Sequence, residues 1–382
     1  MDNMLTNFSN INFLKGSDLS VFKDVNSKIL NYFKDFGAKE VELPTLFNFE
    51  ILLNLYGEDL RSRAFNINDP LTGEKILRPE FTVPMVIMHM NSKKKYEIYS
   101  YSGCVWRKQI SSSSEKNEIP QVGIEIFHKK NSSMYDAKVF KLFFDIINFD
   151  SIELEIGDLG VLRSILDLIE ISDYKKRILL KHIWRPKRFL NLIEKFSDNK
   201  LSLKSEKYLL DLKKLDQIKK SFDKGEKIFG LRTIDEIKER INLINEENYT
   251  LPINKKDKDL IIKVQSLSCK LDKAPCILES LFGKEKKFLE SIDKLKERNE
   301  ELINLKINIK DILFAVSHLR SGAEFYDGFT FGFFKKNDKN LPALAKGGRY
   351  DALTKIIRSG ESLPSIGGMI RPDLYSDLVE KQ

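Results

Sequence analysis

Residues 120–127 contain two polar side chains that could do chemistry, Gln121 and Glu125, on either side of Gly123. Apolar and other residues alternate along this stretch, which is typical of a strand. In a strand the amide and the carboxylate point to one face, and the glycine between them leaves room for a small polar ligand on the sheet. The alternative interpretation is an ordinary strand whose polar face meets water.

The cysteine and histidine residues do not form a pattern typical of a metal site or a disulfide framework. Cys104, Cys269 and Cys276 are odd in number and show no Cys-x-x-Cys spacing. The four histidines are scattered, and none forms a pair with metal-ligand spacing. We therefore expect buried thiols, no metal and no cofactor.

Length and charge limit the class of protein. A chain of 382 residues is long enough for two structural units. It lacks an apolar run of about 18 residues and a secretory signal, which favours a cytoplasmic protein without a membrane span. The net charge of +8 comes from lysines spread among many acids. This indicates compositional bias, although a charge-driven role on nucleic acid is an alternative.

Several predicted elements would position residues 120–127. A serine-rich loop, which includes Ser111 to Ser114, joins this strand to the preceding one, and the two strands form a hairpin. The expected elements are a helix over Asp18–Phe36, a strand over Lys39–Leu43, a turn and return over Asn66–Thr82, a helix over Pro84–Asn91, a strand over Tyr96–Arg107, a helix over Met134–Ile147 and a strand over Ile152–Ile156.

Composition changes near residue 162, where Leu, Lys, Glu and Ile at helical spacing begin to dominate. Strand-like patterns return at 307–316 and 324–334, and a turn and helix follow Gly347. We therefore divide the chain into a first core segment, 1–161, a mostly helical insertion, 162–305, and a second core segment, 306–382. The predicted fold class is α+β, with an antiparallel sheet flanked by helices.

Six motifs in this order resemble the catalytic core of class II histidyl-tRNA synthetases. They are Leu77-Arg-Pro-Glu-Phe-Thr82, Gly103-Cys-Val-Trp-Arg107, Gln121-Val-Gly-Ile-Glu125, Leu154-Glu-Ile-Gly-Asp-Leu-Gly160, Glu324-Phe-Tyr-Asp-Gly328 and Gly347-Gly-Arg-Tyr-Asp351. The resemblance covers roughly residues 15–160 and 310–370. It implies the class II fold and a dimer formed partly through the first helix and the strand that ends at Pro44.

The resemblance also implies a histidine pocket. Glu80, Thr82 and Gln121 match the positions that hold the amino-acid end of histidine, where a carboxylate and oxygen acceptors suit an ammonium group. Glu125 and Tyr326 match the positions that meet the imidazole ring. Tyr350 matches a further tyrosine of the pocket.

The catalytic residues of the family are less well matched. Arg107 matches the arginine that grips the ATP α-phosphate, and we interpret it as a possible remnant of phosphate binding. Gln109 stands where its acidic partner is expected, and Ser321 replaces an arginine. Asp373 and Leu374 replace the terminal Glu-Arg pair, and we expect Pro372 to distort the helix there. Loss of fixed cations at the α-phosphate should slow adenylation by orders of magnitude.

The chain ends at Gln382, and we expect no anticodon-binding domain. A retained pocket without that domain resembles the histidyl-tRNA-synthetase-like regulatory subunits of ATP phosphoribosyltransferase. This subfamily implies activation of a short-form catalytic subunit and feedback by L-histidine in the first step of histidine biosynthesis. It implies a homodimer within a hetero-octamer of four regulatory and four catalytic chains, with no nucleic-acid or membrane partner. The effector site is either the synthetase-like pocket or a contact between the two subunits.

Two alternatives remain at the level of sequence. A truncated enzyme that activates histidine with ATP would need substitute cations, for which Arg349 and Arg371 are candidates. A regulator that binds histidine alone, or acts in translation through its basic surface, would show salt-dependent tRNA binding. The chain has no phosphoribosyl-diphosphate loop motif, and we do not expect it to transfer a phosphoribosyl group itself.

Overall fold

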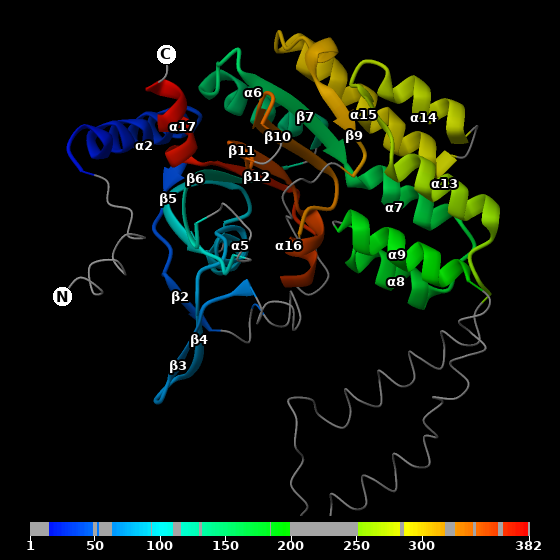
Figure 1. Ribbon diagram of the computed structural model, residues 1–382, viewed down its shortest axis with the longest axis horizontal. Helices are drawn as coiled ribbons and strands as arrows, with labels where there is room; N and C mark the ends of the chain where they lie inside the picture. Colours follow the sequence, from blue (N-terminus) through cyan, green and yellow to red (C-terminus); the bar gives the residue numbers. More distant parts are fainter. Residues whose placement is uncertain are drawn as a thin grey trace, which may run out of the picture.

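The computed structural model describes residues 15–48, 52, 63–92, 94–109, 116–129, 132–183, 185–198, 251–282, 286–317, 325–338, 341–357 and 362–380. The serine-rich loop at 111–114 and residues 320 and 321 lie outside these ranges. Labels of helices and strands follow Figure 1.

A nine-stranded sheet forms the centre of the protein (Figure 1). Most neighbouring strands are antiparallel, while the pairs β1–β5 and β7–β9 are parallel. In spatial order the strands are β1 (Lys39–Glu40), β5 (Glu97–Trp106), β6 (Glu118–Phe127), β12 (Ser365–Ile370), β11 (Ala345–Arg349), β10 (Phe329–Lys335), β7 (Ile152–Asp158), β9 (Leu313–Ala315) and β8 (Ser268–Lys270). Strands from both core segments are therefore interleaved in one sheet.

A separate three-stranded sheet extends away from the central one (Figure 1). Its strands are β2 (Leu46–Asn48), β4 (Gly73–Leu77) and β3 (Asn66–Asp69). The Asp69 side chain accepts a hydrogen bond from the backbone of Leu71, so the expected turn chemistry closes the β3–β4 hairpin.

Helices near the two chain ends pack side by side against the sheet (Figure 1). Helix α2 (Ser17–Asp35) buries Val25, Ile29 and Phe33, which lie at steps of four residues. Gly37 ends it with a φ of 102°, a conformation that glycine adopts without steric cost. The partner helix α17 (Pro372–Val379) begins at Pro372, because a proline at the first helical position needs no N–H partner. The expected distortion by Pro372 was therefore wrong.

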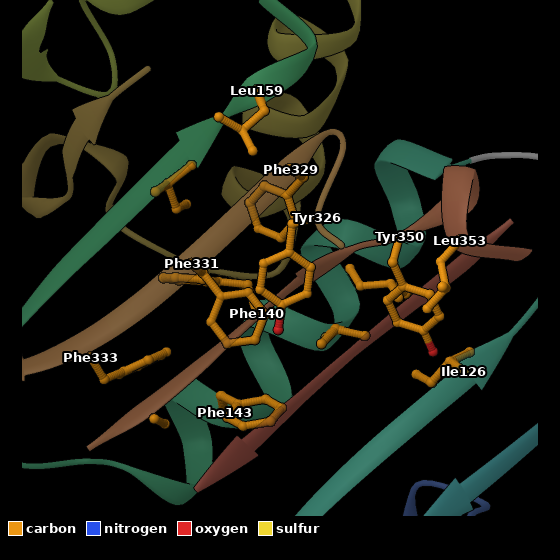
Figure 2. Close-up of a cluster of buried hydrophobic side chains, with 14 of the residues drawn as sticks. Ile126, Phe140, Phe143, Leu159, Tyr326, Phe329, Phe331, Phe333, Tyr350 and Leu353 are labelled. Atoms are coloured by element: carbon orange, nitrogen blue, oxygen red, sulfur yellow. The ribbon is translucent and has the colours of Figure 1, made fainter. Parts of the chain in front are cut away.

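The remaining helices of the core include α6 and α16, which pack against strands of the sheet. Helix α6 packs on β11 and β12, and its Phe140 and Phe143 contact Phe331 of β10 (Figure 2). The stretch from Gly347 to Arg349, which we expected as a turn, is the end of strand β11, and the helix starts only at Asp351. These helices are α5 (Thr82–Asn91), α6 (Ser132–Ile146) and α16 (Asp351–Ile357).

The described part of 162–305 is mostly helical, and it also contributes β8 to the edge of the central sheet. Helix α15 packs against α6 and α7, so this part is continuous with the core. The helices are α7 (Leu159–Leu168), α8 (Asp173–Lys181), α9 (Pro186–Ser197), α13 (Lys255–Gln265), α14 (Ala274–Phe282) and α15 (Lys286–Asn304), followed by the 3-10 turn η3 (Ile309–Asp311). Among the described helices, none has the length and apolar character needed to cross a bilayer.

Candidate functional site

The strand register places Gln121, Gly123 and Glu125 on one face of the sheet. Glu125 lies opposite Tyr99 of β5 and Gly367 of β12, and residues directly opposite each other share a face. The predicted alternation is therefore confirmed. All six residues of the expected histidine pocket are buried, with at most 8% of any of them exposed: Glu80, Thr82, Gln121, Glu125, Tyr326 and Tyr350.

Glu125 is the centre of this site. The hydroxyl of Thr82 donates a hydrogen bond to Glu125 Oε1 at 2.9 Å, and the hydroxyl of Tyr350 donates to Oε2 at 2.6 Å. Burial raises the pKa of Glu125 to about 8, although both hydrogen bonds act in the opposite direction. An empty site at pH 7 therefore holds Glu125 mostly as the neutral acid.

The carboxylate of Glu125 has space because Gly367 has no side chain. A Cβ atom at Gly367 would lie 1.7 Å from Glu125 Oε2. In the same way, a Cβ atom at Gly348 would lie 3.0 Å from the ring of Tyr326. Two glycines on adjacent strands thus allow an acid and a phenol to lie close to the sheet.

Glu80 lies at the start of α5 and accepts hydrogen bonds from the backbone N–H of Val83 at 3.1 and 3.0 Å. A carboxylate in this position also complements the positive end of the helix dipole. The pKa of the Tyr326 phenol is raised, first by burial and then by the negative charges of Glu125 and Glu80. Tyr326 therefore stays protonated and can donate a hydrogen bond at neutral pH.

Tyr101 occupies the space above Gly123 that we expected a ligand to use. A Cβ atom at Gly123 would come within 2.3 Å of the Tyr101 ring and hydroxyl. The rings of Tyr101 and Phe81 are stacked, with their centroids 4.0 Å apart. The guanidinium of Arg78 lies 3.9 Å from the centroid of the Phe81 ring. The expectation of an open gap at Gly123 was wrong, because the cross-strand tyrosine fills it.

Tyr101 was not among the predicted site residues. It lies directly opposite Gly123 in the β5–β6 hairpin, and a tyrosine facing a strand glycine is a cross-strand pair that the register could have indicated.

Arg107 lies at the end of β5, half-buried, and its Nε donates to the carbonyl of Pro79 at 2.8 Å. Its positive charge lowers the pKa of Tyr326, which places it within electrostatic reach of the site. Gln109 donates from its side chain to the carbonyl of Lys116, across the hairpin. The hydrogen bond to the carbonyl of Pro79 thus orients the Arg107 side chain.

The two other arginines considered as substitute cations are buried and paired with carboxylates. Arg349 pairs with Ile366 across the strands, and Ile366 pairs with Ile126. Ile126 directly follows Glu125 in β6, so Arg349 lies on the face of the sheet away from Glu125. There it is 6% exposed and forms an ion pair with Asp136 at 2.6 Å. Arg371 is 5% exposed and pairs with Asp373 at 3.3 Å.

The chain is similar to known proteins in sequence and in fold. The family described as histidyl-tRNA synthetase matches residues 10–251. The chain is 25% identical over 349 residues to the histidine–tRNA ligase of Methanocaldococcus jannaschii, covering 90% of this chain and 68% of that protein. It is 24% identical over 364 residues to the ATP phosphoribosyltransferase regulatory subunit of Agrobacterium fabrum, covering 89% of this chain and 92% of that protein.

Solved structures share the fold. A Bacillus halodurans protein described as an ATP phosphoribosyltransferase regulatory subunit/histidyl-tRNA synthetase matches with a TM-score of 0.66 and 17% identity, over 96% of this chain and 81% of that one. A histidine–tRNA ligase subunit from Alicyclobacillus acidocaldarius matches with a TM-score of 0.62 and 15% identity, over 98% of this chain and 97% of that one. These neighbours confirm the α+β class II synthetase-like fold.

Proposed function

Because the chain belongs to the histidyl-tRNA synthetase family, we propose that it binds histidine as a non-catalytic regulatory subunit of ATP phosphoribosyltransferase. In this role it activates a short-form catalytic subunit in the cytoplasm and makes it sensitive to L-histidine. It acts as a homodimer within a hetero-octamer of four regulatory and four catalytic chains. The similarity to a regulatory subunit along nearly its whole length supports this assignment.

The observation that carries the proposal is the position of Arg349 and Arg371. Adenylation develops negative charge at the α-phosphate of ATP, and fixed cations must lie there to stabilise it. Both arginines are instead buried in ion pairs with Asp136 and Asp373. Arg107, by contrast, lies within electrostatic reach of Tyr326.

The histidine site is the second part of the proposal. Histidine lies against the face of Glu125, where the ionised carboxylate accepts one imidazole N–H and the protonated Tyr326 donates to the other ring nitrogen. Glu80, Thr82 and Gln121 hold the amino-acid end, and Tyr350 supports Glu125. Feedback is then a coupling free energy between this site and the catalytic partner, typically 1–3 kcal/mol.

The Glu125→Ala variant tests this assignment. It should still activate the catalytic subunit, whereas its affinity for histidine should fall by about 100-fold, because a hydrogen bond to a charged group is lost. Inhibition of phosphoribosyl transfer by histidine should disappear in parallel. Glu125→Gln, which keeps the side-chain size, serves as the control for folding. Normal inhibition of the Glu125→Ala complex would place the effector elsewhere, such as at the contact between subunits.

A histidine-activating enzyme is the second candidate, because several relatives are named histidine–tRNA ligases. It would use Arg107 as the phosphate-binding group. Histidine-dependent exchange of pyrophosphate into ATP by the isolated chain separates the two. We expect no exchange above background.

A further inference from the structure

A buried ion-pair cluster lies behind the sheet, on the face opposite Glu125. Arg349, at the end of β11, donates two hydrogen bonds to Asp136 Oδ1, from Nε at 3.0 Å and from Nη2 at 2.6 Å. It also donates to the carbonyl of Ser132 at 3.1 Å, to His128 at 3.2 Å and to Asp351 at 3.1 Å. One guanidinium thus joins the end of β11 to the start of α6 and to α16.

Asp136 is shared with a second arginine. Arg298 of α15 donates to Asp136 at 3.1 Å and to Asp158, at the end of β7, at 2.6 Å. All four side chains are at least nine-tenths buried. Removal of one member of such a buried cluster would leave an uncompensated charge, which is strongly destabilising.

The main chain around Arg349 continues to both tyrosines of the histidine site. Arg349 directly precedes Tyr350, whose hydroxyl binds Glu125. The carbonyl of Arg349 accepts a hydrogen bond from the backbone N–H of Asp327 at 3.0 Å, and Asp327 directly follows Tyr326. Figure 2 shows Tyr326 and Tyr350 among the buried side chains near this strand.

Asp327 strengthens the same connection. Its carboxylate accepts from the backbone N–H groups of Asp351 at 3.1 Å and Ala352 at 2.8 Å, at the start of α16. Asp351 in turn accepts from Arg349 and from the backbone of Ser365 in β12. The segments that carry Tyr326 and Tyr350 are therefore fixed to each other and to the ion-pair cluster.

We propose that Arg349 and Asp136 are positioning residues for the histidine site: their ion pair behind the sheet sets the positions of Tyr350 and Tyr326 without contact with the ligand. The inference rests on the proposed histidine-binding function. The ion pair fixes the end of β11, and the alternation of side chains along the chain then directs Tyr350 toward Glu125. Histidine affinity depends on the cluster because a misplaced tyrosine weakens its hydrogen bonds in a buried site.

The test measures histidine binding to the full chain by calorimetry across pH. Arg349→Lys keeps the charge but loses the two-bond contact with Asp136, and we expect histidine to bind about tenfold more weakly, the size of one misplaced hydrogen bond. The pH midpoint of binding should shift upward, as in Tyr350→Phe, since the Tyr350 hydroxyl lowers the pKa of Glu125. The variant that combines Arg349→Lys with Tyr350→Phe should lose little further histidine affinity, because both changes weaken the hydrogen bond from Tyr350 to Glu125.

Asp136→Asn provides a second test of the same pair if Arg349→Lys does not fold. Phe189→Leu in α9 is the matched control, since Phe189 is fully buried and its helix lies outside the cluster. It should lower the free energy of unfolding and leave both the affinity and the pH midpoint unchanged. Wild-type affinity and midpoint in a folded Arg349→Lys or Asp136→Asn chain would overturn the positioning role alone. Absence of histidine binding by the wild-type chain would overturn the proposed function together with this inference.

Discussion

The protonation of Glu125 determines how the proposed site responds to pH. Burial raises the pKa of this acid to about 8, so the empty pocket holds a proton at neutral pH. The proposed complex needs the ionised carboxylate as an acceptor for imidazole, and binding must then release that proton. Because the unliganded state binds more protons than the complex below pH 8, the affinity for histidine rises with pH in that range.

We predict that the dissociation constant for histidine falls as pH rises from 6.5 to about 8 and is constant above it, with a slope of at most about tenfold per pH unit. Calorimetry in buffers of different ionisation enthalpy should show release of about one proton at pH 7. Glu125→Gln cannot release this proton and should bind weakly without the slope. A wild-type affinity that does not change across this range would show that Glu125 keeps its protonation state on binding.

The sequence named candidate residues but not how they contact each other. The resemblance identified six residues, and in the structure all six are buried, with Thr82 and Tyr350 in hydrogen bonds with Glu125. The six are Glu80, Thr82, Gln121, Glu125, Tyr326 and Tyr350. The direct hydrogen bond from Thr82 to Glu125 was not predicted, because the two residues were assigned to opposite ends of a ligand. Nor was the direction of Arg349, since it depends on the register of β11 with β12.

Strand β12 (Ser365–Ile370) shapes the site through a glycine, not through a polar side chain. Its Gly367 lies directly under the Glu125 carboxylate, and the strand is buried along its whole length. The Glu125 carboxylate therefore has space because the neighbouring strand carries a glycine at this position.

We predict that Gly367→Ala displaces the Glu125 carboxylate, because the new methyl group would lie 1.7 Å from Oε2. Histidine affinity should fall by about 100-fold, and the free energy of unfolding should fall by about 1–3 kcal/mol through overpacking. Gly328→Ala is the control, since its methyl group would meet the Arg349 side chain at an ordinary 3.5 Å. It should change binding by less than about twofold. Unimpaired binding by Gly367→Ala would mean that the carboxylate position is unimportant for histidine.

Helices and long strands were predictable because their periodicity is local. The helices over 17–35 and 132–146 and the strands over 97–106 and 118–127 agree with their patterns to within about two residues. Strand β11 was mistaken for a turn because its Gly-Gly pair lacks the side chains that mark a strand. Pairing between β12 and β11, which lie far from β6 in the sequence, supplies the missing context only in the folded chain.

In the whole molecule, one sheet separates two polar regions with different tasks. On one face Glu125 and its partners form the proposed ligand site, and on the other face Arg349, Asp136, Arg298 and Asp158 form an ion-pair cluster. Helix α15 of the mostly helical segment provides Arg298, so that segment stabilises the rear of the site.

The regulatory assignment is tested by measuring phosphoribosyl transfer by a short-form catalytic subunit from the same source, alone and with this chain, in the absence and presence of histidine. We predict that the chain co-elutes with the catalytic subunit and raises its activity, and that histidine suppresses the increase. Failure to co-elute and to activate would contradict the regulatory assignment, and histidine-dependent pyrophosphate exchange would then decide whether the chain is an enzyme in its own right.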